Sequence, residues 1–226
     1  MHNAQNRYGF KFLTTVVFWS LILAAPVVSR ATTVYSNFGA SFAYDTGEGN
    51  LVGNDDAGDN LAEADTFTPG FTSTLQTIEI ALSCEFVSDC PDATTVAIET
   101  DSGSDSPSGV VLESFTIAGN TLPTFGVSTH LTLTSVLNPT LTSGVQYWIA
   151  VESDTNNRVE WNLNSTGDTS DQDVSGDGGT TWFSASGQTP SAYEVDGIAS
   201  SVPEPGTLGM LLGGGLLLGL LRKIRG

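Results

Sequence analysis

The chain has 226 residues, enough for one well-buried domain once terminal segments are set aside. It carries 25 acidic and 7 basic residues; residues 32–202 hold 24 of the acids and one base, Arg158, so the formal charge of that stretch is −23. Such a surface repels nucleic-acid phosphates and anionic lipid head groups, which excludes nucleic-acid binding. Regular runs of aromatic and β-branched residues argue against intrinsic disorder, the rival interpretation of high net charge.

Residues 1–31 have the layout of a secretory signal peptide. Arg7 and Lys11 precede an apolar stretch, residues 12–28, and small residues occupy the −3 and −1 positions of a cleavage after Ala31. This pattern predicts a signal helix that is removed on export through the inner membrane. A retained N-terminal anchor is the alternative.

Strand patterns recur between residues 32 and 200 at the spacing typical of a β-sandwich or barrel. Alternating apolar and polar residues predict strands at 77–83, 114–117 and 129–134, and residues 145–151 are apolar on both faces, as in a central buried strand. Further strand candidates are residues 33–38, 64–67, 94–99, 158–162, 180–184 and 192–197. No long stretch keeps a helical period. We therefore expect an all-β domain, an antiparallel β-sandwich of jelly-roll type.

Several segments together resemble the choice-of-anchor family, most closely the kind designated R. They are VYSNFG (34–39), AEADTFTP (62–69), SGVVLE (108–113), LTSGVQYW (141–148), EWN (160–162) and DGGTTW (177–182). The resemblance covers nearly all of residues 33–197 and implies a surface domain that occurs with different anchors. The family has no established catalytic residues, so the resemblance implies none here.

Cys84 and Cys90 are the two cysteines of a chain expected to reach an oxidising compartment. We predict a disulfide between them that closes a loop of residues 85–89. So small a ring adds less stability than the roughly 3 kcal/mol expected for a 15-residue loop. A metal or redox site would need a third ligand or a CxxC spacing, and the sequence has neither.

One acidic segment resembles the opening of a calcium-binding loop. It places oxygen-bearing side chains at alternate positions, at Asp171, Asp173, Ser175 and Asp177. The twelfth position is Trp182, where such loops carry a bidentate Glu. Two interpretations stay open, a calcium site and an acidic solvated turn before a strand. No other cofactor is indicated.

Catalytic motifs such as GxSxG, HExxH or a glycine-rich phosphate loop are missing from the sequence. With 24 carboxylates, a glycosidase pair could be drawn almost anywhere, so composition points to none. Trp148, Trp161 and Trp182 could form either a sugar-stacking face or part of a sandwich core. We therefore expect a non-enzymatic protein; the alternatives are a carbohydrate- or ice-binding module and, less favoured, a secreted glycoside hydrolase.

The C-terminal segment, residues 201–226, has three parts in a fixed order. These are the motif Val202, Pro203, Glu204 and Pro205, an apolar run at 207–221, and a basic cluster of Arg222, Lys223 and Arg225. Fifteen helical residues span roughly 22 Å, so a transmembrane helix here would be short for a hydrocarbon core of roughly 30 Å and would need local thinning. The positive-inside tendency puts the basic cluster in the cytoplasm and the acidic domain outside.

This tail resembles the PEP-CTERM sorting signal, which has also been labelled an ice-binding protein C-terminal domain. The resemblance implies recognition by an exosortase, a membrane-embedded processing enzyme of bacteria that make exopolysaccharide. Pro203, Glu204 and Pro205 would be recognised as substrate. It further implies anchoring on the periplasmic side of the membrane and then delivery to the cell surface or extracellular matrix, with exopolysaccharide as a candidate partner.

Overall fold

The computed structural model describes residues 30–86 and 88–200, so the predicted signal helix and C-terminal transmembrane helix lie outside the described residues. In chain order the elements are β1 (Thr32–Ser36), β2 (Gly49–Asn54), β3 (Asn60–Phe67), β4 (Ser73–Ile80), β5 (Leu82–Cys84), β6 (Thr94–Asp101), β7 (Pro107–Ile117), a 3-10 turn η1 (Gly119–Thr121), β8 (Leu131–Thr134), β9 (Thr140–Leu141), β10 (Tyr147–Ser153), β11 (Arg158–Asn162), β12 (Gln172–Ser175), β13 (Phe183–Ser184) and β14 (Tyr193–Ala199).

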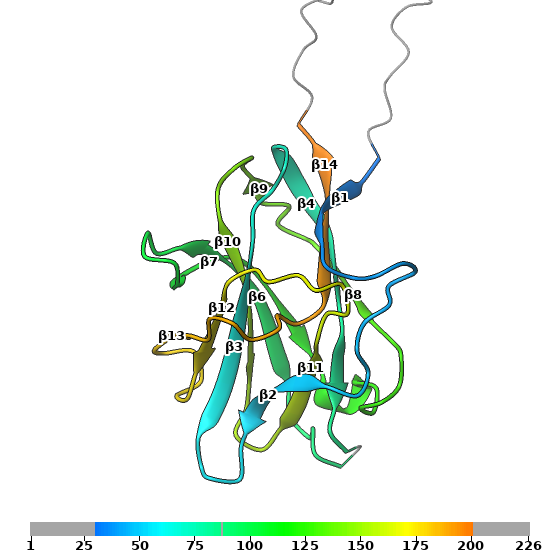
Figure 1. Cartoon of the computed structure of the whole chain (residues 1–226), viewed down its shortest axis with the longest axis vertical. Helices are drawn as coiled ribbons and strands as arrows, with labels where there is room; N and C mark the ends of the chain where they lie inside the picture. Colours follow the sequence, from blue (N-terminus) through cyan, green and yellow to red (C-terminus); the bar gives the residue numbers. More distant parts are fainter. Residues whose placement is uncertain (1–29, 87, 201–226) are drawn as a thin grey trace, which may run out of the picture. The chain divides into compact units, whose positions relative to one another are not determined.

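These strands form two sheets (Figure 1). The first has the order β1-β14-β4-β8, and β9 also pairs with β4. The second has the order β5-β11-β2-β3-β10-β6-β7, with β12 on β3 and β13 on β12. All pairings between these strands are antiparallel, so the prediction of an all-β, antiparallel, sandwich-like domain is confirmed. The jelly-roll connectivity stays a prediction.

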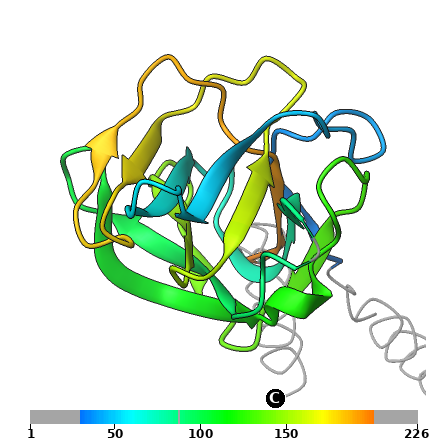
Figure 2. The same cartoon turned by 90° about the horizontal axis from the view of Figure 1, so that it is seen from below.

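One apolar core joins the two sheets. Leu75 and Ile78 of the first sheet belong to the same buried cluster as Val96, Ile98 and Ile149 of the second. Seen from below, the strands surround a common interior (Figure 2). The sheets are thus held together by burial of the inward-facing side chains, the main favourable term in such folds.

β10 is the buried central strand that the sequence predicted at 145–151. It lies between β3 and β6, and residues 147–151 are buried on both faces. Ile149 joins the core between the sheets, whereas Trp148 packs with Ala64 and Ala150 on the opposite face. A strand covered on both sides needs apolar residues at every position, which is why it reads as an unbroken apolar run.

The single strand predicted at 77–83 is wrong. The structure divides it at Ala81 into β4 of the first sheet and β5 of the second. The backbone of Ala81 makes two hydrogen bonds between the two strands. Its N–H donates to the carbonyl of Ala192 (3.1 Å), and its carbonyl accepts from the N–H of Asn162 (2.9 Å). Ile80 and Leu82 are both buried, so the alternation of the sequence continues across the break between the strands. The sequence pattern therefore does not reveal the break.

The described domain begins and ends at one edge. β1 pairs with β14, and Thr32 lies opposite Gly197 (Figure 1). The loop between β2 and β3, residues 55–59, lies at the other end of the domain in the same view. The two terminal segments therefore attach at the same edge of the sandwich.

Candidate functional site

Two carboxyl side chains lie in the interior beside the core. Glu63 and Asp65 are two residues apart on β3, so both point to the same face of the strand, and both are buried. The intervening Ala64 points the other way, where it packs with Trp148. Strand alternation thus places two acids in positions that apolar residues occupy elsewhere in the sandwich.

The side chain of Glu63 is held by three donors from three segments. Its Oε1 atom accepts hydrogen bonds from Asn50 Nδ2 of β2 (2.5 Å), from Gln172 Nε2 of β12, and from Ser191 Oγ just before β14 (2.9 Å). The backbone N–H of Ser191 donates to Asp65 Oδ2 (2.8 Å). Each carboxyl group is therefore anchored through one of its two oxygens.

The other oxygens of this cluster have no partner among the described residues. They are Glu63 Oε2, Asp65 Oδ1 and Gln172 Oε1, all buried. A buried polar atom without a hydrogen bond typically costs about 1–3 kcal/mol. Three such acceptors lie on neighbouring side chains of this cluster. Contacts within the described protein do not account for them.

Burial sets the ionisation of both acids. Desolvation raises the pKa of Glu63 to about 8, against the lowering effect of its three hydrogen bonds, and the charge of Glu160 adds to the rise. Desolvation also raises the pKa of Asp65 well above its ordinary value, with a further contribution from neighbouring Glu63. Without a compensating positive charge, both groups are therefore protonated at neutral pH.

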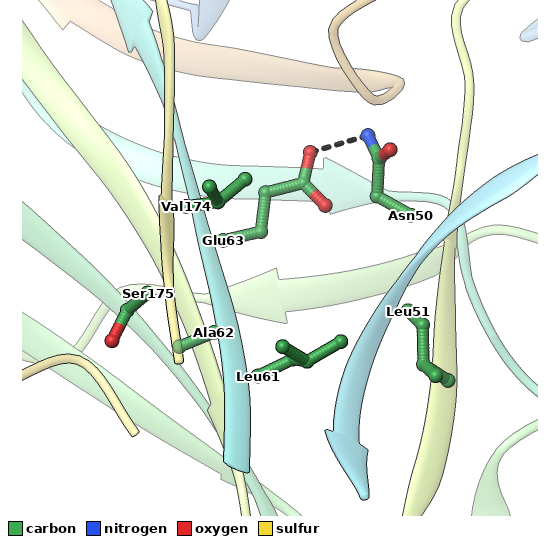
Figure 3. Close-up of a pocket in the computed structure, with 7 residues that line it drawn as sticks. All are labelled: Asn50, Leu51, Leu61, Ala62, Glu63, Val174 and Ser175. Atoms are coloured by element: carbon green, nitrogen blue, oxygen red, sulfur yellow. Dashed lines mark hydrogen bonds between the residues drawn. The ribbon is translucent and has the colours of Figure 1, made fainter. Parts of the chain in front are cut away.

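A pocket of about 260 Å³ reaches this cluster. Its lining residues are Asn50, Leu51, Leu61, Ala62, Glu63, Val174 and Ser175, from β2, β3 and β12 (Figure 3). β3 pairs with β2 at Leu61 and with β12 from Ala62 onward, so the pocket lies where these two neighbours of β3 separate. Figure 3 shows the Glu63 carboxyl group turned toward Asn50, with Leu51 and Leu61 along the lower wall. The pocket is largely apolar and has one ionisable group.

The predicted calcium loop is a strand instead. Its centre forms β12, which pairs with β3, so Asp173 and Ser175 share one face while Gln172 points to the other. Asp177 accepts hydrogen bonds from Ser175 Oγ (2.8 Å) and from the backbone N–H of Thr181 (2.8 Å), so its carboxylate braces the following turn. In the described part of the chain no group of three or more His, Cys, Asp or Glu side chains gathers as a metal site. Calcium binding at Asp171, Asp173, Ser175 and Asp177 stays a prediction.

The predicted disulfide is confirmed. Cys84 of β5 and Cys90 are bonded, with their Cα atoms 6.0 Å apart, and both are buried. Cys84 pairs with Val159 of β11, so the bond ties the loop after β5 to the edge of the larger sheet. It serves the fold and lies outside the carboxyl cluster.

The tryptophans do not form a surface platform. Trp148 and Trp161 are 0% exposed, and Trp161 packs against Tyr193 in the core, with the rings tilted by 52° and their centroids 5.8 Å apart. Trp182 is partly buried and covers Trp148 and Ala64 from outside. Of the two roles open to these side chains, the structure shows core packing.

Sequence reasoning missed the carboxyl cluster. Its one local signal is the pattern Ala-Glu-Ala-Asp at 62–65, where acids alternate with alanines at the start of an aromatic strand. Such a pattern normally means that the acids face solvent and the alanines face the core. Here both faces of β3 are covered, and only the tertiary structure shows it.

The sorting residues 202–205 and the basic cluster at 222–225 lie outside the described residues. The family comparison is decisive for them. Residues 201–225 match the PEP-CTERM protein-sorting motif. This motif supports export of the protein, anchoring in the membrane before processing, and sorting by an exosortase. No curated protein and no solved structure matches the chain. In the two stretches that the structure describes, no helix is long and apolar enough to cross a membrane.

Proposed function

We propose that this chain is a non-enzymatic surface or extracellular-matrix protein, delivered by its PEP-CTERM motif and associated with exopolysaccharide. The observation that carries the proposal is the motif at residues 201–225, which begins two residues after the end of β14. In this proposal the β-sandwich is the domain that is sorted, and the tail is its sorting signal. A signal peptide at 1–31 and a domain of the choice-of-anchor R kind at 32–200 complete the proposed organisation.

The position of the termini supports display from the membrane. Because β1 and β14 are neighbours, the leader and the tail join the sandwich at the same edge. The loop at 55–59 lies at the opposite end of the domain from this edge (Figure 1). This arrangement suits a domain that is held on the periplasmic side before processing and exposed at the cell surface afterwards.

The carboxyl groups support a non-enzymatic role. A glycosidase places its two carboxyl groups on either side of a sugar, in a cleft that the sugar can enter. Glu63 and Asp65 are 1% and 0% exposed, and both lie on the same face of one strand. These two acids are therefore unsuited to act as a glycosidase pair, whereas a structural or binding role does not need access for a sugar.

The aromatic residues bear on the second candidate, a carbohydrate- or ice-binding module. Stacking on sugars needs exposed rings, whereas Trp148, Trp161 and Tyr193 are buried. The exposed Thr132 and Thr134 of β8 form a row of two, too short for an ice-binding face. We infer that contacts with exopolysaccharide use the polar and acidic surface, and the ice-binding label of the tail finds no support in this domain.

An epitope tag in the loop at 55–59 tests delivery. Intact cells of an exosortase-containing strain should bind antibody to the tag, and labelling should fall at least about tenfold when Pro203, Glu204 and Pro205 are replaced together by alanine. Alanines at Ser102 and Ser104, in the exposed β6–β7 loop, are the matched control and should leave labelling unchanged. Equal labelling of the motif variant, or of a strain without the exosortase, contradicts the proposed sorting.

The association with exopolysaccharide is tested separately. Polymer purified from the same strain should co-sediment with the exported protein, and its chain length should stay constant on prolonged incubation. Failure to co-sediment removes the polysaccharide partner but leaves sorting intact. Shortening of the polymer would instead favour the hydrolase alternative.

A further inference from the structure

Three buried oxygen atoms of the sandwich accept no hydrogen bond from any group in the described chain. Glu63 Oε2, Asp65 Oδ1 and Gln172 Oε1 each lack a hydrogen-bond partner there, and their side chains are 1%, 0% and 2% exposed. The oxygen of Gln172 is always an acceptor, and those of Glu63 and Asp65 are acceptors when the two acids are ionised, as they would be beside a cation. Buried acceptors of this kind are normally paired with a donor or a cation.

The three oxygens come from adjoining positions of one strand pair. Asp65 of β3 lies directly opposite Gln172 of β12, and Glu63 is two residues along β3 on the same face. The amide of Gln172 is directed at the cluster, because its Nε2 atom donates to Glu63 Oε1. The unpartnered oxygen of Gln172 therefore belongs to the same side-chain head group that holds the glutamate.

Three donors near the cluster converge on one oxygen atom. Asn50 Nδ2, Gln172 Nε2 and Ser191 Oγ all donate to the same atom, Glu63 Oε1. The N–H of Ser191 donates to Asp65 Oδ2. These hydrogen bonds fix the orientation of both carboxyl groups and leave the second oxygen of each for another partner.

We propose that Glu63, Asp65 and Gln172 bind a calcium ion inside the sandwich. The ligand atoms are all oxygens, the type that hard cations prefer, and two carboxylates balance the charge of a divalent ion. Calcium accepts irregular geometry and a mixture of carboxylate, amide and water ligands, whereas magnesium demands a near-ideal octahedron. The charge of −23 on residues 32–202 also raises the local concentration of cations.

The pocket reaches one of the three proposed ligands. Glu63 belongs to its lining, so the carboxyl group stands at the boundary between the pocket and the interior (Figure 3). Water in the pocket could complete the coordination shell of the ion, since three protein oxygens are fewer than the six to eight that calcium takes. The site would therefore be filled from the side where β2 and β12 separate.

This site is distinct from the calcium loop that the sequence suggested. Asp173 and Ser175 point to the opposite face of β12 from Gln172, as strand alternation requires. The two candidate sites share a strand but no side chain. Substitutions can therefore separate them.

The test uses the full chain, freed of metal with EDTA. Added CaCl₂ should raise Tm by about 5 °C or more at a concentration about 100-fold above Kd, whereas MgCl₂ and NaCl at matched ionic strength should not. Glu63→Gln and Asp65→Asn each keep the size of the side chain and should weaken calcium binding by at least about tenfold in calorimetric titration, since each removes a charged ligand. Asp171→Asn with Asp173→Asn is the matched control and should bind calcium as the wild type does.

A second readout covers variants that fail to fold. Terbium, which replaces calcium at oxygen sites, should give emission sensitised by the nearby Trp161 and Tyr193 in the wild-type chain, and calcium should displace it. The proposal is overturned if the wild type shows neither a calcium-dependent Tm nor displaceable terbium emission. It is also overturned if the Asp171/Asp173 pair, rather than Glu63 and Asp65, abolishes binding.

Discussion

Glu63 and Asp65 show how one strand can combine a structural and a chemical role. Their backbone belongs to the sheet, but their side chains enter the interior, where desolvation opposes ionisation. The hydrogen bonds from Asn50, Gln172 and Ser191 partly offset that penalty for Glu63. The residual cost links the stability of the domain to pH and to whatever cation is present.

In the presence of EDTA, the domain should lose stability as the pH rises from 5 to 8.5. The pKa of Glu63 is raised from its ordinary value of 4.5 to about 8 in the folded state, so folding retains a proton that the unfolded chain releases over this range. The stabilisation is complete below the unfolded pKa and is lost as the pH passes through the folded one. Glu63 alone contributes roughly 5 kcal/mol to this loss, because one pKa unit corresponds to about 1.4 kcal/mol.

Chemical unfolding at several pH values measures this slope. Glu63→Gln, which does not titrate, should flatten it, while Asp171→Asn, at an exposed site, should leave it as in the wild type. A slope unchanged by Glu63→Gln would contradict the assignment of the raised pKa.

At the scale of elements, β12 explains why the site forms. Four residues pair with β3 where β2 has moved away, and this brings Gln172 opposite Asp65. β12 in turn carries β13, and Trp182, next to β13, covers Trp148 on the outer face of the sheet. β12 thus has two effects. Through β13 it brings Trp182 onto the outer face of the sheet, and through Gln172 it adds the third side chain to the cluster of Glu63 and Asp65.

The disulfide acts on another element, the three-residue β5. Replacing Cys84 and Cys90 together by serine should lower the free energy of unfolding by less than about 3 kcal/mol, because the loop that the bond closes is short. Wild-type protein treated with a reductant should show the same loss in denaturant titrations. Complete unfolding of the double variant at 25 °C would mean that the bond does more than restrict this loop.

At the scale of the whole molecule, charge is divided between the ends and the middle. Six of the seven basic residues lie outside residues 32–202, and 24 of the 25 acids lie inside. The sandwich joins both terminal segments at the β1–β14 edge. The division of charge and the shared edge suit a domain that is tethered at one end on the far side of a membrane.

Reporter fusions test this orientation. Alkaline phosphatase fused after Gly226 should be inactive, since the basic end is expected to stay in the cytoplasm before processing, whereas the same enzyme fused after Ser200, in place of the tail, should be active. A fluorescent protein that folds only in the cytoplasm should give the reverse pattern. Phosphatase activity after Gly226 would show that the tail crosses the membrane in the other direction.

Local sequence was enough for much of the fold. The alternation at 129–134 and the apolar run at 145–151 correspond to β8 and β10, because side-chain period and burial are local properties of a strand. Local sequence was not enough at Ala81, where the chain passes from one sheet to the other while the alternation of side chains continues unchanged. It also failed at Gln172–Ser175, because an acidic segment with turn residues around it reads as a loop until a neighbouring strand pairs with it.

The sequence by itself determined the sorting motif, the acidic character of the domain, its β class and the cysteine pair, because each depends on residue type or on short spacing. Only the tertiary structure decided that the tryptophans are core residues and that Glu63, Asp65 and Gln172 meet. The physical reason is that burial depends on what covers each face of a strand. The groups that cover Glu63 of β3 come from β2, 13 residues away along the chain, and from β12 and the segment before β14, which are 109 and 128 residues away.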